Sequence, residues 1–376
     1  MSWQRWLAEQ REERERAGLR RALRPRALGE DVLDLAGNDY LGLSAHPEVR
    51  AAAAGAARSW GAGSGASRLV TGTTTLHGEL EAELADFTGR PAALVCSTGY
   101  HANLSAVTAL ADRDALIVSD AHVHASLIDA ARLSRAAVDV VPHNDVDAVR
   151  AALEKADGRR AMVLTESVYS VLGDAAPLPE LAALCAERGA LLLVDEAHGL
   201  GVVGDGGRGL VAGLGEAPQV VMTATLSKSL GAMGGAVLGS PELVEHLVNR
   251  ARPFIFDTAL APAPTAGALA ALRLLRDRPD LPERIHHRAA RLAERLGVTR
   301  SAGAVLSVPM SSPQRALAAQ DAARQAGVRV GCFRPPSVPD GVSRLRITTQ
   351  AGIAEDAWDR AVEVLAGVVE RHRRAA

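Results

Sequence analysis

The chain has 376 residues, 48% hydrophobic and 23% charged, which excludes disordered, collagen-like and coiled-coil proteins and predicts two to three folded units. Basic and acidic residues nearly balance, 42 against 44, so no net field recruits nucleic acid or membrane, and a small-molecule ligand is expected. The lack of a long apolar run, a secretory signal or metal-type spacing at Cys96, Cys185 and Cys332 predicts a reduced, cytoplasmic protein without a structural metal.

In chain order, residues 1–45 are predicted to form an N-terminal arm, and residues 46–255 a large domain. The arm opens with an Arg- and Glu-rich amphipathic helix over about residues 1–30, packed on the main body through Trp3, Trp6, Leu7 and Leu19. The large domain contains short apolar runs that predict strands at 92–96, 115–118, 138–141, 161–165, 191–195, 220–223 and 235–239. Because these runs are continuously apolar, they predict a mostly parallel seven-stranded α/β sheet between helices.

A proline-rich break at residues 253–264 ends this pattern. Residues 256–376 are predicted to form a long linker helix and a smaller α+β domain, with strands near 304–309, 328–333 and 344–348 and a last helix from about 354. In open α/β sheets the ligand lies at the carboxyl ends of the strands, so the polar residues there are the functional candidates.

Lysine is almost absent from the chain. Of the 42 basic residues only Lys155 and Lys228 are lysines, and Lys155 stands in a polar helix end. Lys228 follows a strand in a small, apolar segment, where a desolvated amine would have the lowered pKa that imine chemistry requires. Without further context, a covalent role for Lys228 and the chance survival of one lysine are about equally supported.

Polar residues at other strand ends agree with a covalent role for Lys228. Asp195 and His198 follow the strand at 191–195; the alternative is a helix cap and a solvated histidine. An acid, a histidine and an apolar-flanked lysine on one sheet edge suit an aldehyde cofactor, whose ring nitrogen the acid keeps protonated.

Two further segments could complete a cofactor site. The turn at Ser97, Thr98 and Gly99 opens a helix after a strand, so its N–H groups can face a phosphate, with Tyr100 at the pocket wall. Further along, His124 could stack on a planar ring. His122 lies two residues before it, but a metal site is less well supported because no third ligand has suitable spacing.

Other functions remain as alternatives. A nicotinamide dehydrogenase is disfavoured because the glycine-rich stretch 61–65 lacks the GxGxxG spacing and follows a helical segment. A non-catalytic binding protein would lack the visible absorbance of a cofactor imine.

Taken together, these motifs resemble the pyridoxal-phosphate-dependent α-oxoamine synthases of the type I aminotransferase fold. The resemblance covers nearly the whole chain, and most closely matches the branch that acts in biotin biosynthesis. It rests on the stretches 38–43, 61–68, 194–199, 225–228, 334–339 and 343–346.

The resemblance implies pyridoxal 5'-phosphate as cofactor and assigns roles by position. Lys228 would form the imine and transfer protons, Asp195 would pair with the ring nitrogen, His198 with the ring hydroxyl, and His124 would stack on the ring. Phosphate contacts are implied for Gly99, Tyr100, Thr225 and, from the partner chain of a homodimer, Thr258. A cofactor contact is implied for Ser170, and substrate contacts for Arg20, Asn38, His124, Ser337 and Arg346, the last holding the amino-acid carboxylate.

The implied reaction is the decarboxylative condensation of L-alanine with a pimeloyl thioester, carried by coenzyme A or a carrier protein. The alternative within the family is a glycine C-acetyltransferase, which uses glycine and acetyl-CoA. Two positions depart from the family pattern. Leu172 stands where an acid is common, which puts the local loop geometry in question, and Ser337 replaces a threonine but keeps the hydroxyl.

Overall fold

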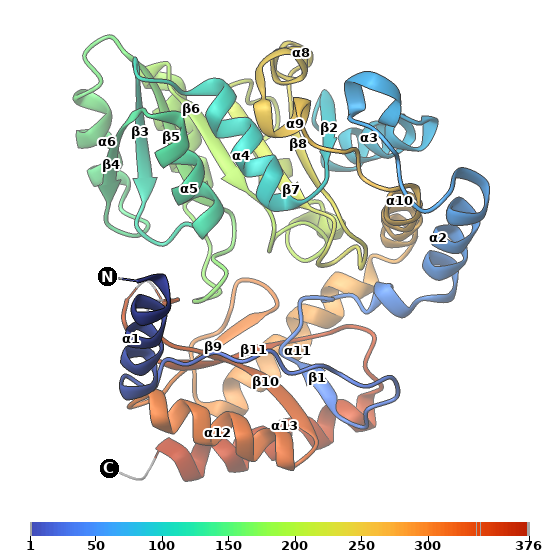
Figure 1. Ribbon diagram of the computed structural model, residues 1–376, viewed down its shortest axis with the longest axis vertical. Coiled ribbons are helices and arrows are strands. Elements are labelled where there is room, and N and C mark those ends of the chain that lie inside the picture. Colours follow the sequence, from blue (N-terminus) through green and yellow to red (C-terminus); the bar gives the residue numbers. More distant parts are fainter. Residues whose placement is uncertain (1, 336, 339, 374–376) are drawn as a thin grey trace.

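The chain folds into two parts, each with its own sheet and core, as the computed structural model shows (Figure 1). The structure describes residues 2–335, 337–338 and 340–373. The upper part in Figure 1 contains the predicted large domain, and the lower part contains the N-terminal segment and the C-terminal third.

The upper part is built on a seven-stranded sheet in the order β2-β8-β7-β6-β5-β3-β4. β8 runs antiparallel to both of its neighbours, β2 and β7, whereas the four other strand pairs are parallel. This confirms the predicted mostly parallel sheet. The strands are β2 (Ala92–Cys96), β3 (Ala115–Asp120), β4 (Ala137–Val141), β5 (Arg160–Glu166), β6 (Leu191–Asp195), β7 (Val220–Thr225) and β8 (Gly235–Gly239).

Helices bury both faces of this sheet, which explains the continuously apolar strands. One face is covered by α4 (Gly99–Leu110), α5 (Ala125–Ser134), α8 (Pro241–Arg250) and α9 (Arg252–Ile255). The other is covered by α3 (Thr75–Thr88), α6 (Val146–Glu154), α7 (Leu178–Arg188) and α10 (Pro262–Asp277), and α2 (Pro47–Trp60) packs on α10.

The lower part has a four-stranded sheet in the order β1-β10-β11-β9. Its strands are β1 (Leu33–Leu35), β9 (Val305–Pro309), β10 (Val328–Phe333) and β11 (Arg344–Thr348). The core beside it is closed by α11 (Asp280–Leu296), α12 (Pro313–Gln325) and α13 (Glu355–Arg373). The sequence did not reveal β1, whose three residues pair in parallel with Val328–Val330, about 300 positions later in the chain.

The N-terminal segment differs from its prediction. Helix α1 spans only Trp3–Arg16, and none of its residues is buried, so packing on the main body through Trp3, Trp6 and Leu7 is wrong. Gly18, at φ +65°, ends the helical stretch, because this left-handed conformation favours glycine. Leu19 follows in an extended segment. None of the described helices is long and apolar enough to cross a membrane.

The predicted linker helix is also two helices, α10 and α11, separated at Arg278 and Pro279. The sheet order matters more for function. β5, β6 and β7 are neighbours in parallel, so their carboxyl ends bring Glu166, Asp195 and the segment after Thr225 to one edge.

Candidate active site

Lys228 lies three residues beyond β7 and faces His198. The Lys228 Nζ is 2.8 Å from His198 Nε2. Desolvation lowers the pKa of Lys228 to about 8, although the nearby carboxylates of Asp195 and Glu166 oppose that shift. A lysine with this pKa is partly unprotonated near neutral pH, which is the state that can attack a carbonyl carbon.

His198 links the lysine to a second polar group. It is buried, and its Nδ1 lies 2.7 Å from the Tyr40 hydroxyl. Burial, followed by the charge of Lys228, lowers the pKa of His198 well below its ordinary value. His198 is therefore neutral at physiological pH, with one nitrogen donating and the other accepting.

Asp195, the last residue of β6, is a buried carboxylate fixed by neutral donors. It accepts hydrogen bonds from Asn103 Nδ2 at 2.7 Å and from the Ala197 N–H at 2.9 Å. No cationic side chain among the described residues forms an ion pair with it. A buried carboxylate normally pairs with a positive group, so Asp195 is suited to a protonated ring nitrogen.

His124 joins the same network through Asn103. The Asn103 amide also donates to Ser126 Oγ at 2.8 Å, and Ser126 Oγ lies 2.8 Å from His124 Nδ1. Burial lowers the pKa of His124, so its ring is neutral and can stack on a planar group. The ring of His122, in contrast, stacks on the ring of His143 at a centroid distance of 4.0 Å.

The amino end of α4 forms a narrow cradle. A Cβ at Gly99 would stand 2.8 Å from Thr225 Cβ, and a Cβ at Gly235 would stand 2.5 Å from the Gly99 nitrogen. Side chains are therefore excluded where backbone N–H groups of α4 begin, as the close approach of a phosphate requires. Thr225, the last residue of β7, borders this cradle with its hydroxyl.

Arg346, on β11, meets the upper part of the molecule. It is buried, and it donates to the Ser170 carbonyl at 2.7 Å, to Asn38 Oδ1 at 3.1 Å and to the Tyr40 hydroxyl at 3.4 Å. No carboxylate pairs with it in the part of the chain that the structure describes. Its charge is therefore available for an anionic group of a ligand.

Arg344, two residues before it, is buried as well but is held by Asp340 in a two-pronged ion pair at 2.9 and 2.6 Å. Arginines that alternate along a strand often lie on a solvated face, but both of these are buried. Only the tertiary contacts distinguish them: Arg344 already has a carboxylate partner.

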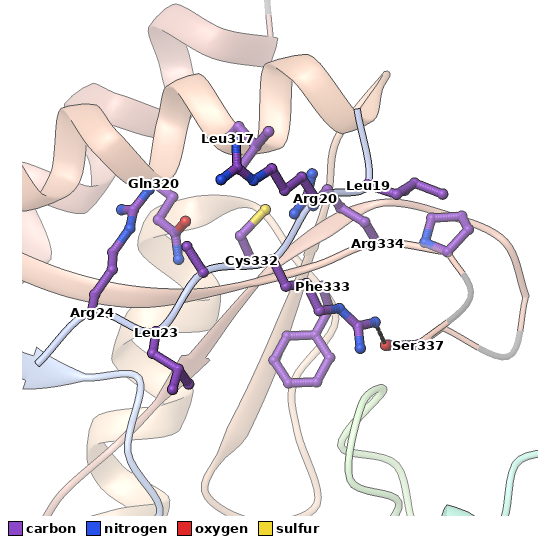
Figure 2. A pocket seen from close by; sticks show the side chains of 13 residues that line it. Leu19, Arg20, Leu23, Arg24, Leu317, Gln320, Cys332, Phe333, Arg334 and Ser337 are labelled. Atoms are coloured by element: carbon purple, nitrogen blue, oxygen red, sulfur yellow. Dashed lines mark hydrogen bonds between the residues drawn. The ribbon is translucent and has the colours of Figure 1, made fainter. Parts of the chain in front are cut away.

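Arg20 and Ser337 line a separate cavity of about 600 Å³ (Figure 2). In Figure 2 the extended segment with Arg20, Leu23 and Arg24 faces Gln320, Cys332 and Phe333 of the lower part. Ser337 accepts a hydrogen bond from Arg21, whereas Arg20 pairs with Glu15. Pro336 and Pro339 of the predicted motif lie outside the described residues.

This cavity adjoins the Arg346 site through Phe333. Phe333 lines the cavity, and the Arg346 guanidinium lies over the Phe333 ring, 5.4 Å from its centroid. Arg20 and Ser337 make no contact with Lys228 in the described structure. The predicted substrate residues thus fall into two neighbouring groups.

Two predicted phosphate residues are less closely joined to the site. The Tyr100 side chain is 41% exposed, and its hydroxyl donates to Asp129. Thr258 is exposed, beside Asp257, whose carboxylate accepts a hydrogen bond from Ser97. Within one chain, therefore, only the backbone of Tyr100 is placed at the amino end of α4.

Sequence reasoning missed Glu166, the last residue of β5. It is buried, and its Oε2 accepts the Ser170 N–H at 3.2 Å while its Oε1 has no partner. Burial, then repulsion from Asp195, raises the pKa of Glu166 well above its ordinary value, which disfavours the charged form of this carboxyl group. Its position at a strand end was the signal that could have identified it.

The roles of Asn103 and Tyr40 were also missed. Asn103 lies inside the helix that begins at Gly99, and Tyr40 lies inside the motif at 38–43. Their signal was weak, because a polar residue in a helix or loop shows its partner only when distant segments meet.

The loop with the unusual Leu172 is closed by backbone contacts. Gly173 N–H donates to the Tyr169 carbonyl and Tyr169 N–H to the Asp174 carbonyl, both at 2.9 Å. Gly173 has φ +79°, and a Cβ there would stand 2.1 Å from the Val305 carbonyl oxygen. Loop geometry thus depends on Gly173 and not on an acid at position 172.

The described residues fit pyridoxal phosphate. They supply a desolvated amine at Lys228, a buried carboxylate without a cation at Asp195, a neutral ring at His124 and a side-chain-free cradle at Gly99. Each of these matches one chemical feature of the cofactor: its aldehyde, its ring nitrogen, its ring face and its phosphate.

Comparisons with known proteins agree with this fit. The family model for aminotransferase class I and II matches residues 30–365. The chain is 55% identical to an 8-amino-7-oxononanoate synthase of Mycobacterium sp. (strain JLS), covering 98% of this chain and 97% of that protein. The Mycobacterium tuberculosis (strain H37Ra) synthase is 54% identical, with 98% and 96% covered.

Solved structures give the same result. A Sphingomonas wittichii serine palmitoyltransferase superposes with a TM-score of 0.90 at 30% identity, covering 97% of each chain. An 8-amino-7-oxononanoate synthase from Francisella tularensis superposes with a TM-score of 0.77 at 26% identity, covering 90% of this chain and 98% of that one.

Proposed function

The chain belongs to the aminotransferase class I and II family, and from this membership and its site we infer how it carries out 8-amino-7-oxononanoate synthesis. The protein is a pyridoxal-phosphate-dependent acyltransferase of biotin biosynthesis. The type I aminotransferase fold expected from the sequence is confirmed. The observation that carries the assignment of roles is the buried, carboxylate-free Arg346 beside the Lys228 network.

Lys228 is the group that moves protons. When bound, pyridoxal phosphate supplies an electron sink for the negative charge that develops on the α-carbon of the amino acid. The Lys228 amine, once free, takes the α-proton, since its pKa of about 8 lies close to neutral pH. The hydrogen bond from Lys228 to His198 orients the amine.

Asp195 and His124 hold the cofactor ring in this proposal. Asp195 keeps the ring nitrogen protonated, and Asn103 fixes the carboxylate for that purpose. His124 covers the ring face. Gly99, Tyr100 and Thr225 contact the phosphate, the first two through their backbone N–H groups.

Arg346 binds the carboxylate of alanine. A guanidinium can grip a carboxylate through parallel N–H bonds, and Asn38, Tyr40 and the Ser170 carbonyl hold it in place. The reaction later releases this carboxylate as carbon dioxide. These neutral partners leave the charge of Arg346 unneutralised until the substrate arrives.

The cavity beside Phe333 receives the acyl thioester. It is lined by apolar groups such as Leu19, Leu23 and Leu317, and by arginines, which suits an acyl chain ending in a carboxylate. Arg20 and Ser337 stand on its wall together with Phe333, whose ring contacts Arg346. The acyl group thus reaches the amino acid from the lower part of the molecule.

The active form in this proposal is a homodimer. Helix α1 leaves Trp3 77% exposed with no residue buried, and Phe256 and Val70 are 71% and 74% exposed on segments joined by the Ala259–Ala66 hydrogen bond. Apolar side chains of this size are normally covered by a partner. Thr258 is exposed on the same segment as Phe256 and, in this proposal, contacts the phosphate of the partner's site.

The cytoplasm is the proposed location. All three cysteines are free, and Cys96 and Cys185 are buried thiols, as expected in a reducing compartment.

A substrate matrix tests the proposed function. Alanine and glycine are each combined with pimeloyl, acetyl and succinyl thioesters, as coenzyme A and as carrier-protein conjugates, and carbon dioxide and free thiol are measured. We expect alanine with a pimeloyl thioester to give the highest kcat/KM. Preference for glycine with acetyl-CoA would instead identify a glycine C-acetyltransferase.

Substitution of Arg346 should weaken alanine binding. Both Arg346→Lys and Arg346→Ala remove the two-pronged grip, which costs roughly 1.5–3 kcal/mol, or about 10- to 150-fold in affinity. Calorimetric titration of the holoenzyme with alanine measures this. Arg344→Lys is the matched control, because Asp340 holds that residue, and its alanine affinity should stay within about threefold. A large effect at Arg344 with none at Arg346 would refute the assignment.

Replacing Glu166 with glutamine should preserve activity, whereas replacing it with alanine should lower activity. Glu166→Gln keeps the shape of the side chain and an acceptor for the Ser170 N–H, and burial already disfavours the charge of Glu166, so kcat/KM for alanine should stay within about threefold. Glu166→Ala leaves that N–H unpaired next to Arg346 and should lower kcat/KM about tenfold. Equal losses in both variants would show that an ionised carboxylate is required.

A further inference from the structure

His143 lies between two carboxylates outside the site described above. It follows β4 by two residues, and its Nδ1 is 3.0 Å from Asp120 Oδ1 while its Nε2 is 2.7 Å from Asp174 Oδ2. A carboxylate oxygen only accepts hydrogen bonds, so each ring nitrogen must carry a proton to donate. The geometry therefore requires the imidazolium form.

Each carboxylate belongs to a loop that carries active-site groups. Asp120 ends β3 and accepts the His122 N–H at 2.7 Å, which shapes the turn leading to His124. Asp174 ends the loop that starts at Ser167, whose Ser170 carbonyl accepts the hydrogen bond from Arg346. One charged ring thus joins the loop of His124 to the loop that supports Arg346.

Packing holds the ring in this position. Tyr169, the neighbour of Ser170, meets the His143 ring edge-on at 4.3 Å, and the Tyr169 hydroxyl lies 2.8 Å from Thr165 Oγ1. Asn144 supports both carboxylates: its N–H donates to Asp120 at 2.8 Å and its side-chain amide to Asp174 at 3.0 Å. The His143 ring is therefore held by Tyr169 as well as by the two carboxylates, and Asn144 holds the carboxylates in turn.

We propose that His143 is a positioning residue for the amino-acid half of the reaction, joining the His124 loop to the Ser170 loop so that Arg346 meets the alanine carboxylate. The inference rests on the proposed function. It does not extend to the acyl cavity, whose lining comes from residues 19–24, 317, 320, 332–335 and 337.

His143→Gln tests the proposal in the holoenzyme. Glutamine is neutral and has a single amide donor group, so it cannot bridge both carboxylates. We expect KM for alanine and its calorimetric Kd to rise about tenfold, while KM for the pimeloyl thioester stays within twofold. His122→Gln is the matched control, because His122 stacks on the same ring but shares no carboxylate bridge, and its alanine Kd should change less than twofold.

A pH series on the unfolding of the protein supplies a readout independent of turnover. Burial opposes the charge of His143, but the two carboxylates outweigh it and raise its pKa to about 9. A group whose pKa is raised on folding adds to the free energy of unfolding. For His143 this stabilisation is complete below its ordinary pKa of 6.5 and is lost as the pH rises through about 9. The wild-type advantage over His143→Gln should therefore be largest at pH 6. The titratable groups facing His143 are Asp120, Asp174, His122 and Tyr169.

Asp174→Asn is the second variant in case His143→Gln does not fold. It removes one carboxylate at a side chain that is 41% exposed, and should raise the alanine Kd about threefold. Unchanged alanine affinity in a folded variant, with or without a stability loss, overturns the proposal. If wild type does not condense alanine with any thioester, the proposed function fails, while the pH-dependent bridge can still be measured.

Discussion

Lys228→Ala is expected to abolish turnover while the protein still folds. The residue stands beyond the end of β7, and the only side-chain hydrogen bond described for it is with His198, so the core keeps its packing. Loss of both the covalent attachment point and the proton-transfer group should lower kcat by at least about 10³-fold. Wild-type protein treated with borohydride should gain the cofactor mass by mass spectrometry, and the variant should not.

Lys228→Arg should fail as completely, because a guanidinium stays protonated and cannot attack the cofactor aldehyde. Lys155→Arg is the matched control at the other lysine, which is exposed and pairs with Asp139 at 2.8 Å; it should be silent. Cofactor fixed by borohydride in either Lys228 variant would disprove the role of this lysine.

Removal of the amine should also change the pH dependence of stability in the apoprotein. The folded-state pKa of Lys228, about 8, is below its ordinary 10.5, so the folded protein binds fewer protons between these values. The penalty for burying the ammonium is full below pH 8 and disappears as pH rises to 10.5. Lys228→Ala should therefore unfold at a higher temperature than wild type near pH 7.

Asp195→Asn is expected to bind the cofactor yet to slow removal of the alanine α-proton by about 10²-fold or more. The single amide oxygen can still accept one of the two hydrogen bonds that Asn103 Nδ2 and the Ala197 N–H donate to separate carboxylate oxygens of Asp195, and the local fold should persist. It carries no negative charge to hold the ring nitrogen protonated, which makes the ring a poorer electron sink.

Exchange of the alanine α-proton with deuterated water, followed by nuclear magnetic resonance, measures this step without the thioester. Asp139→Asn, which changes an acid on the edge strand β4, is the control and should exchange at the wild-type rate. Wild-type exchange in Asp195→Asn would reduce Asp195 to a turn-capping residue.

The sequence was sufficient for the residues whose role follows from local position. Apolar runs identified the seven strands of the large sheet: six are buried on both faces, which leaves a mark along the whole strand, whereas the edge strand β4 is mostly exposed but still rich in valine. The carboxyl ends of those strands then pointed to Lys228, Asp195 and His198, which the structure brings to one edge. His124 was also a candidate from the sequence around it, and the family motifs added Arg346.

Strand boundaries and short elements were less visible. β1 has only three residues and exists because Val328–Val330 lies beside it, so no local pattern could indicate it. The N-terminal helix was predicted to be longer than it is, because its charge pattern continues past Gly18, where the helical stretch ends. Among the described residues, no other element buries the apolar side chains of this helix.

Tertiary structure alone decided how the functional residues are connected. Arg344 and Arg346 are equivalent in the alternation of β11, and only the position of Asp340 shows which arginine is free for a substrate. The partners Asn103, Glu166 and His143 lie on separate elements, and their charges and hydrogen bonds depend on distances of about 3 Å that sequence spacing does not encode. Local composition thus determined the strands and the chemistry at their ends, whereas long-range packing determined which side chains meet and in which protonation state.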